Sequence, residues 1–130
     1  MPAKRWRMKR VTAQRKSPAT YSTQTQGSQL DRDGCRSVAI LAKGIADENR
    51  LRILMSMVGT RKSVTRIVEE VGLSQPLVSH HLRELRRCLL VDIQREGPFV
   101  YYGLADPRII EVVGTLSAVA ASLVAGRTSL

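Results

Sequence analysis

Residues 73–85 read LSQPLVSHHLREL, and this stretch combines two different faces of one expected helix. Steps of about 100° per residue from Val78 place Leu82, Leu85 and Leu89 on one apolar face. The opposite face carries hydroxyl, imidazole and guanidinium groups without a carboxylate, and they belong to Ser79, His80, Arg83 and Arg87. A DNA recognition helix needs such a pairing, because the apolar face anchors the helix while the polar face reads bases and phosphates.

The first turn of this helix adds further candidate DNA contacts. Ser74 and Gln75 open it, and the Gln75 amide suits a bidentate contact with adenine. Pro76 fits in the first turn, where backbone N–H groups have no partner within the helix. We therefore expect Ser74 and Gln75 to join the outer face as DNA-binding residues.

The preceding residues predict a shorter helix and a tight turn. Thr65 is a suitable N-cap, the apolar positions are Ile67, Val68 and Val71, and Gly72 can end the helix in the left-handed conformation. Two helices joined by the turn at 72–74 predict a helix-turn-helix. An ordinary αα-hairpin with an exposed basic face satisfies the same periodicity.

A β-hairpin is predicted directly after the recognition helix. Residues 90–95 alternate at period two, 96–98 read Glu-Gly-Pro as a turn, and 99–104 are rich in β-branched and aromatic residues. A hairpin in this place is a wing, with Arg95 at its tip as a candidate contact to a phosphate or the minor groove. The alternative for Arg95 is a solvated surface cation.

Three separated blocks resemble the ArsR/SmtB family of winged helix-turn-helix transcriptional regulators. They are LAKGIADENRLRIL at 41–54, the recognition stretch at 73–85, and REG at 95–97 with VYYGLADP at 100–107. The resemblance covers about residues 38–107 and does not reach the first 30. It implies a homodimeric DNA-binding repressor, built through its first and last helices, that often responds to a metal or to thiol oxidation.

The positive charge is concentrated at the N-terminus. Residues 1–30 hold seven basic residues without an acid, out of a net charge of +10, and residues 31–130 hold 14 basic residues against 11 acidic ones. We interpret 1–30 as a disordered basic arm that would clamp DNA phosphates. The alternatives are a solvated tail and a start codon assigned too far upstream. The segment also has the composition of a transit peptide, but the resemblance to a bacterial family argues against that interpretation.

Residues 31–130 are predicted to form one mainly α-helical domain of about five helices with a small β-hairpin. Further helices are expected at about 30–44 and 47–58, the second with Leu51, Leu54, Met57 and Val58 in the core. A last helix, capped by Asp106 with Pro107 next, is apolar all round over 109–125 apart from Glu111. These 17 residues make a poor membrane span, so a partner subunit is expected to cover them.

The inducer is the least defined feature of the sequence. Metal-sensing relatives carry ligands on the helix before the recognition helix or on the last helix, and both places lack Cys and His here. A metal at His80 and His81 would block DNA directly, and we expect no metal and no cofactor. Cys35 and Cys88 are interpreted as small buried hydrophobic residues, with a thiol switch as the sharper hypothesis.

Together these patterns predict a cytoplasmic, nucleoid-associated regulator that binds double-stranded DNA as a homodimer. A repressor on a palindromic operator is the favoured form, and a non-specific architectural DNA-coating protein is the alternative. A protein-interaction module that uses the winged fold without DNA is a third interpretation. The sequence shows neither a catalytic constellation nor a phosphate-binding loop, so we do not expect an enzyme.

Overall fold

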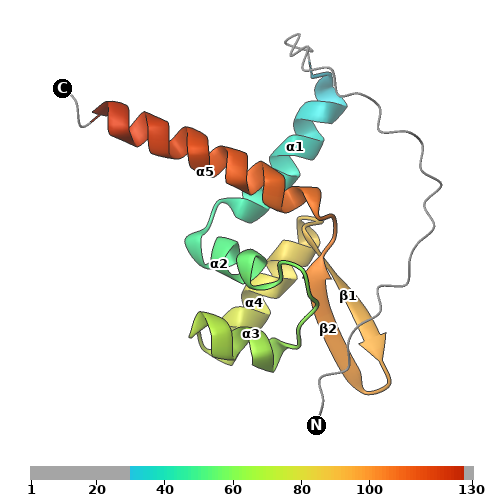
Figure 1. Cartoon of the computed structure of the whole chain (residues 1–130). Helices are drawn as coiled ribbons and strands as arrows, with labels where there is room; N and C mark the ends of the chain where they lie inside the picture. Colours follow the sequence, from blue (N-terminus) through green and yellow to red (C-terminus); the bar gives the residue numbers. More distant parts are fainter. Residues whose placement is uncertain (1–29, 128–130) are drawn as a thin grey trace. The chain divides into compact units, whose positions relative to one another are not determined.

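The computed structural model describes residues 30–127, and the basic arm predicted over 1–30 therefore lies almost entirely outside the described residues. Five helices and one hairpin follow one another within these described residues (Figure 1). They are α1 (Arg32–Ile45), α2 (Glu48–Ser56), α3 (Val64–Val71), α4 (Gln75–Arg87), β1 (Val91–Glu96), β2 (Phe99–Leu104) and α5 (Arg108–Arg127). The predicted winged helix-turn-helix architecture is confirmed.

Four helices begin at a polar side chain that accepts a backbone hydrogen bond from the residue three places on. The N-caps are Asp31, Asp47, Ser63 and Ser74. The prediction that Thr65 caps α3 is wrong, because Ser63 holds the extended conformation and its Oγ accepts from the Arg66 N–H at 3.3 Å. Before α5, Asp106 Oδ1 accepts from the Arg108 N–H at 2.9 Å, which is the capping contact expected from the sequence.

A small core lies between α2, α3 and α4 and extends to the start of the hairpin. It consists of Ile53, Leu54, Met57, Ile67, Val71, Val78, Leu82, Leu85, Cys88, Leu90 and Val91. The prediction that Val58 joins it is wrong, since α2 ends at Ser56 and Val58 is 46 % exposed beyond the helix. Ile53, which was not among the predicted core residues, is fully buried instead.

The end of α4 departs from the predicted apolar stripe. Leu89 is 65 % exposed because the helix ends at Arg87 and Leu89 takes a left-handed conformation with φ of 64°. The Leu90 N–H donates to the Leu85 carbonyl and the Leu89 N–H to that of Arg86, the paired bonds of a Schellman ending. This reversal turns Leu89 outward and places Cys88 and Leu90 in the core.

The wing is a two-stranded antiparallel hairpin with a tight turn. Glu96 pairs with Phe99, so only Gly97 and Pro98 form the turn, and Gly97 supplies a φ of 55°. At its base, Tyr102 exchanges two backbone hydrogen bonds of 2.9 and 2.8 Å with Lys62, which precedes α3. The hairpin is therefore fixed to the segment that leads into the helix-turn-helix.

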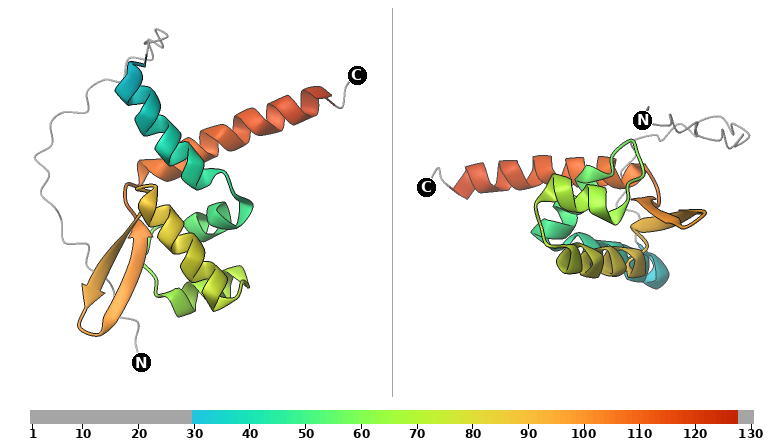
Figure 2. Two further views of the ribbon diagram at one scale, coloured as in Figure 1. Left: turned by 180° about the vertical axis from the view of Figure 1, so that it is seen from behind. Right: turned by 90° about the horizontal axis from the view of Figure 1, so that it is seen from below.

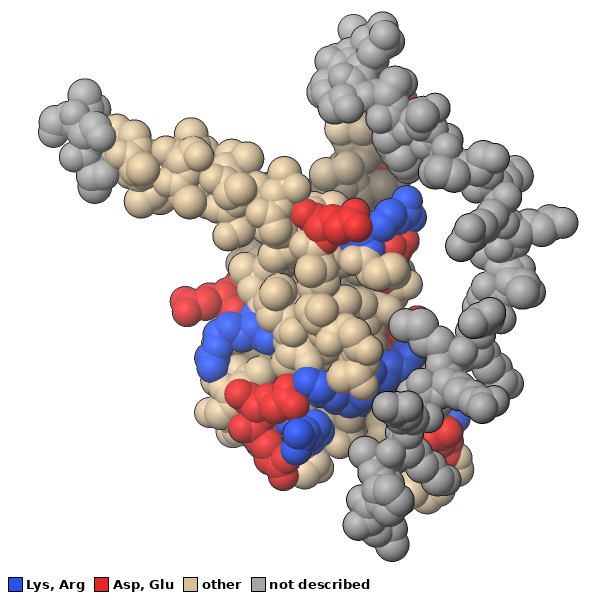
Figure 3. Space-filling model, in the orientation of Figure 1, with Lys and Arg blue, Asp and Glu red and all other residues tan. Residues whose placement is uncertain are grey.

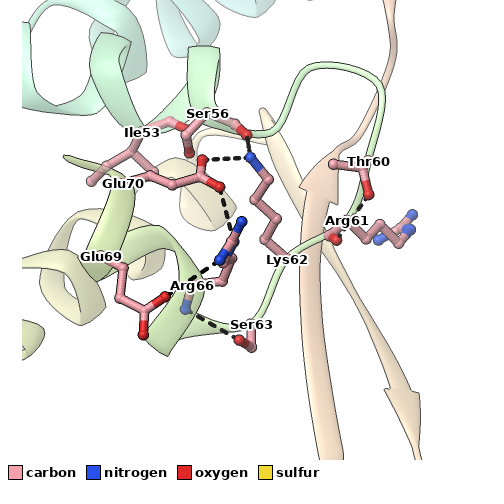
Figure 4. Close-up of polar contacts among 9 residues, drawn as sticks. All are labelled: Ile53, Ser56, Thr60, Arg61, Lys62, Ser63, Arg66, Glu69 and Glu70. Atoms are coloured by element: carbon pink, nitrogen blue, oxygen red, sulfur yellow. Dashed lines mark hydrogen bonds and ion pairs between the residues drawn. The ribbon is translucent and has the colours of Figure 1, made fainter. Parts of the chain in front are cut away.

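A polar cluster joins the segment before α3 to the end of α2 and to the last turn of α3 (Figure 4). Lys62 donates from Nζ to the Ser56 carbonyl oxygen and to the Glu70 carboxylate, and Arg66 Nε lies 3.1 Å from the other Glu70 oxygen. The hydrogen bond from Lys62 is the main reason why the Glu70 pKa lies below its usual value. Arg66 also lies 3.6 Å from Glu69, so its charge is balanced within α3.

The first and last helices contribute little to this core. In α1 the buried residue is Gly44, and α5 has no buried residue. Figures 1 and 2 both show α5 projecting away from the core formed by α2, α3 and α4. The apolar stretch expected over 109–125 lies within a helix of 20 residues. By length and composition alone, α5 is long and apolar enough to cross a membrane.

Candidate nucleic-acid interface

The link between α3 and α4 has the predicted helix-turn-helix form. Gly72 ends α3 with φ of 70° and ψ of 23°, and its N–H donates to the Val68 carbonyl at 2.9 Å. Ser74 then caps α4 by accepting the Leu77 N–H at 3.4 Å. The Ser74 hydroxyl therefore serves the helix as an acceptor, while its own O–H remains a donor next to the exposed Gln75.

The two faces of α4 separate as the sequence predicts. Val78, Leu82 and Leu85 are fully buried, whereas Gln75, His80, Arg83 and Arg87 are exposed and Ser79 is half-buried. Arg87 lies 3.2 Å from Glu84, which flanks the outer face and balances part of its charge. The helix thus presents donors outward over its whole length while its apolar side chains fix it to the core.

His81 does not belong to this outer face. It is 6 % exposed, and neither ring nitrogen has a hydrogen-bond partner within the described part of the chain. Burial lowers the His81 pKa below its usual value; the Asp47 carboxylate opposes that shift, and His80 and Arg50 add to it. The helical wheel contained the signal, since residue 81 lies about 60° from Val78 on the inner side.

A buried neutral imidazole makes folding sensitive to acid. Below pH 6.5 the unfolded chain binds a proton at His81 that the native protein resists, so the free energy of unfolding falls until the lower native pKa is reached. We expect urea unfolding of the wild type to weaken steadily from pH 7 to pH 5.5, by about 1.4 kcal/mol for each unit of pKa depression.

The matched variants for this prediction are His81→Leu and His80→Gln. The first removes the buried titrating group, so its unfolding free energy should be much less dependent on pH over the same range. The second changes an exposed histidine that contributes less to the His81 shift than burial does, so it should retain most of the wild-type slope. Equal slopes in His81→Leu and wild type would contradict the assignment of the acid sensitivity to His81.

Arg95 lies near the tip of the wing, as predicted. It is exposed on β1 and pairs with Val100, one residue pair inside the Glu96–Phe99 pair that closes the turn. Its contact with DNA stays a prediction.

The two cysteines occupy different environments. Cys88 is buried at the C-cap of α4, in agreement with its interpretation as a small hydrophobic residue, but Cys35 is exposed on α1 and that interpretation is wrong for it in the single chain. The thiol switch at Cys35 and Cys88 stays a hypothesis. Within residues 30–127, groups of three or more His, Cys, Asp or Glu side chains placed to hold a metal ion are absent.

Comparisons with known proteins identify the family. The family described as bacterial regulatory protein, arsR family, matches residues 47–92. A probable mercury resistance operon repressor of Streptomyces lividans is 35 % identical over 71 residues, which cover 55 % of this chain and 57 % of the repressor. A transcriptional repressor SmtB homolog of Synechocystis is 32 % identical over 89 residues, covering 68 % of this chain and 67 % of that protein.

Among solved structures, the homodimeric winged helix-turn-helix DNA-binding domain of a possible ArsR-family regulator from Mycobacterium bovis has a TM-score of 0.63 and 27 % identity. The similarity covers 75 % of this chain and 92 % of that chain. The chain spans only about half to two thirds of the length of the curated relatives above. The match of the arsR model to α2–β1, together with these relatives, shows that the chain belongs to the ArsR family of bacterial regulatory proteins.

Proposed function

We propose that the chain is a sequence-specific transcriptional regulator that binds double-stranded DNA through α4, acting as a dimeric repressor on a palindromic operator. The observation that carries the proposal is the division of α4 into a buried apolar face and an exposed face of donors. The relatives are named as repressors and regulators, which supports the same class. Such a regulator works in the cytoplasm at the nucleoid, without enzymatic activity.

The dimer is proposed from the apolar surface that one chain leaves uncovered. Val112, Leu116, Val119 and Leu123 are all exposed on α5, and Val38 and Leu41 are exposed on α1. On the face drawn in Figure 3, α5 shows almost no charged residues. A two-fold partner that covers these helices would place two copies of α4 roughly 34–36 Å apart, one turn of DNA.

Base contacts from α4 predict a loss that depends on DNA sequence. In Gln75→Ala or Arg83→Ala we expect affinity for a duplex selected by the wild type from a random pool to fall by about 1–3 kcal/mol, while affinity for random duplex changes much less. The measurement is fluorescence anisotropy at one fixed salt concentration, where the wild type should prefer its operator by at least about 10³.

The charge-matched control for Arg83→Ala is Arg36→Ala, which removes an exposed cation from α1 instead of α4. It should leave the specificity ratio unchanged. If Gln75→Ala and Arg83→Ala lowered affinity equally on operator and random DNA, the architectural coating protein would become the better interpretation. If the wild type bound neither duplex, the protein-interaction module would be the remaining interpretation.

A further inference from the structure

We infer that a hollow between the C-terminal half of α4 and strand β2 holds one phosphate group of the DNA backbone, with Arg86 as its main ligand. The hollow has a volume of about 380 Å³ and is lined by Arg83, Arg86, Arg87 and Tyr102. The inference rests on the proposed function, and it assigns a role to Arg86 and Tyr102, which were not among the predicted DNA-binding residues. Figure 2 shows that α4 lies beside the hairpin, whose residue Tyr102 lines the hollow opposite the arginines.

The charge around this hollow favours an anion. Residues 83, 86 and 87 are helix neighbours at spacings of three and four, where like charges repel and destabilise the isolated helix. Glu84 balances Arg87, but neither Arg83 nor Arg86 forms an ion pair with an acid among the described residues. Two uncompensated guanidinium groups therefore face one concave surface, and the planar fork of N–H donors on each can bind two oxygens of a phosphate at once.

The wall opposite the arginines is held in place. Tyr102 is half-buried against the core, and its backbone is fixed by the paired hydrogen bonds with Lys62 as well as by its pairing with Ile93. Lys62 is in turn bonded to Ser56 and Glu70. A bound group would therefore meet a fixed surface, which reduces the ordering cost of binding.

Position along α4 distinguishes a phosphate contact from a base contact. Arg86 follows Gln75 by eleven residues, which is about 16 Å along a helix axis. The major groove is about 12 Å wide, and recognition helices reach base edges mainly from their N-terminal residues. With Gln75 at the bases, Arg86 therefore lies at the groove edge, where the phosphates are. Arg83 lies between the two regions, so Arg86 is the residue that tests the inference.

The test compares Arg86→Gln with wild type on the selected operator and on random duplex over a series of salt concentrations. A lost phosphate contact lowers affinity regardless of sequence, so both affinities should fall by at least about tenfold at 0.1 M salt. The slope of log affinity against log salt should become shallower by about 0.9 for each lost contact. Arg86→Lys keeps the charge and should retain most of the slope.

Arg36→Gln, which removes the same charge from α1, should change both affinities less than about twofold and leave the slope unchanged. Unchanged binding in Arg86→Gln would overturn the inference while leaving the proposed function intact. A loss confined to the operator would also overturn it, because that result marks a base contact.

A second experiment tests whether the bound phosphate belongs to the DNA backbone or to a free anion. Inorganic phosphate is titrated at constant ionic strength while the Arg86 Nε–H signal is followed by NMR. Saturable binding of free phosphate together with unchanged DNA affinity in Arg86→Gln would assign the hollow to a small anion and overturn the DNA source. If the wild type bound no DNA, the proposed function would fail, and an Arg86 signal that phosphate does not shift would then overturn the phosphate site itself.

Discussion

Replacing Leu116 and Val119 together by aspartate is expected to convert the proposed dimer into a monomer and to lower operator affinity by about 10²–10⁴. Both side chains are 50 % exposed in the single chain, and with Val112 and Leu123 they form one stripe at helical spacing along α5. Two carboxylates on each chain would have to be buried in the same contact, which costs far more than the apolar contact contributes. Once the chains separate, each α4 binds its half-site alone and the gain from two linked contacts disappears.

The measurement is light scattering at about 10 µM protein, followed by operator binding under the same conditions. Ser117→Asp with Ala121→Asp is the matched control, since both residues are exposed and the pair adds the same charge to the opposite side of α5. The control should remain dimeric and bind operator like wild type. A monomeric wild type would remove the dimer from the proposal, and capture of that monomer by lipid vesicles would make α5 a membrane contact instead.

The helix-turn-helix and the wing could be predicted because their signals are local. Gly72 and Ser74 mark the turn by their own backbone and side-chain chemistry. The first strand is indicated by its alternation and the second by its β-branched and aromatic residues. Helix ends were less predictable. Periodicity alone extends the apolar stripe to Leu89, because it contains no information about where the chain reverses, and a left-handed leucine takes the place where glycine is usual.

The candidate site also has one part that the sequence predicts and one part that it does not. The outward direction of Gln75, His80 and Arg83 follows from a single helix whose inner face is known. The hollow beside Arg86 depends on where β2 lies against α4, and that placement is set by the backbone pairing of Tyr102 with Lys62, 40 positions earlier in the sequence. No periodic pattern within one segment reports such a contact. The burial of His81 follows from the helical wheel, where it lies on the inner side of α4.

The packing of α1 against the end of α4 depends on Gly44, and Gly44→Val is expected to lower the free energy of unfolding by about 3 kcal/mol. A Cβ atom at this position would lie 2.7 Å from the Cys88 Cβ and would overlap the Leu90 side chain. Leu90 Cδ1 can move, but the Cys88 Cβ is fixed to the backbone of the C-cap of α4. Relief therefore requires α1 to shift away from the recognition helix.

The sign of the change in unfolding free energy in Gly44→Ala distinguishes the effect of this contact from that of helix propensity. In an open helix, alanine is more stable than glycine by about 1 kcal/mol, so an unobstructed site would gain stability. At Gly44 the close approach to Cys88 should reverse the sign, with a smaller loss than for valine. Gly126→Ala is the control, because a Cβ there meets no atom within 4 Å in the single chain, and it should be neutral or slightly stabilising. Urea unfolding of the three variants at about pH 7.5 gives the comparison, and a stabilised Gly44→Ala would show that α1 does not approach the end of α4 this closely.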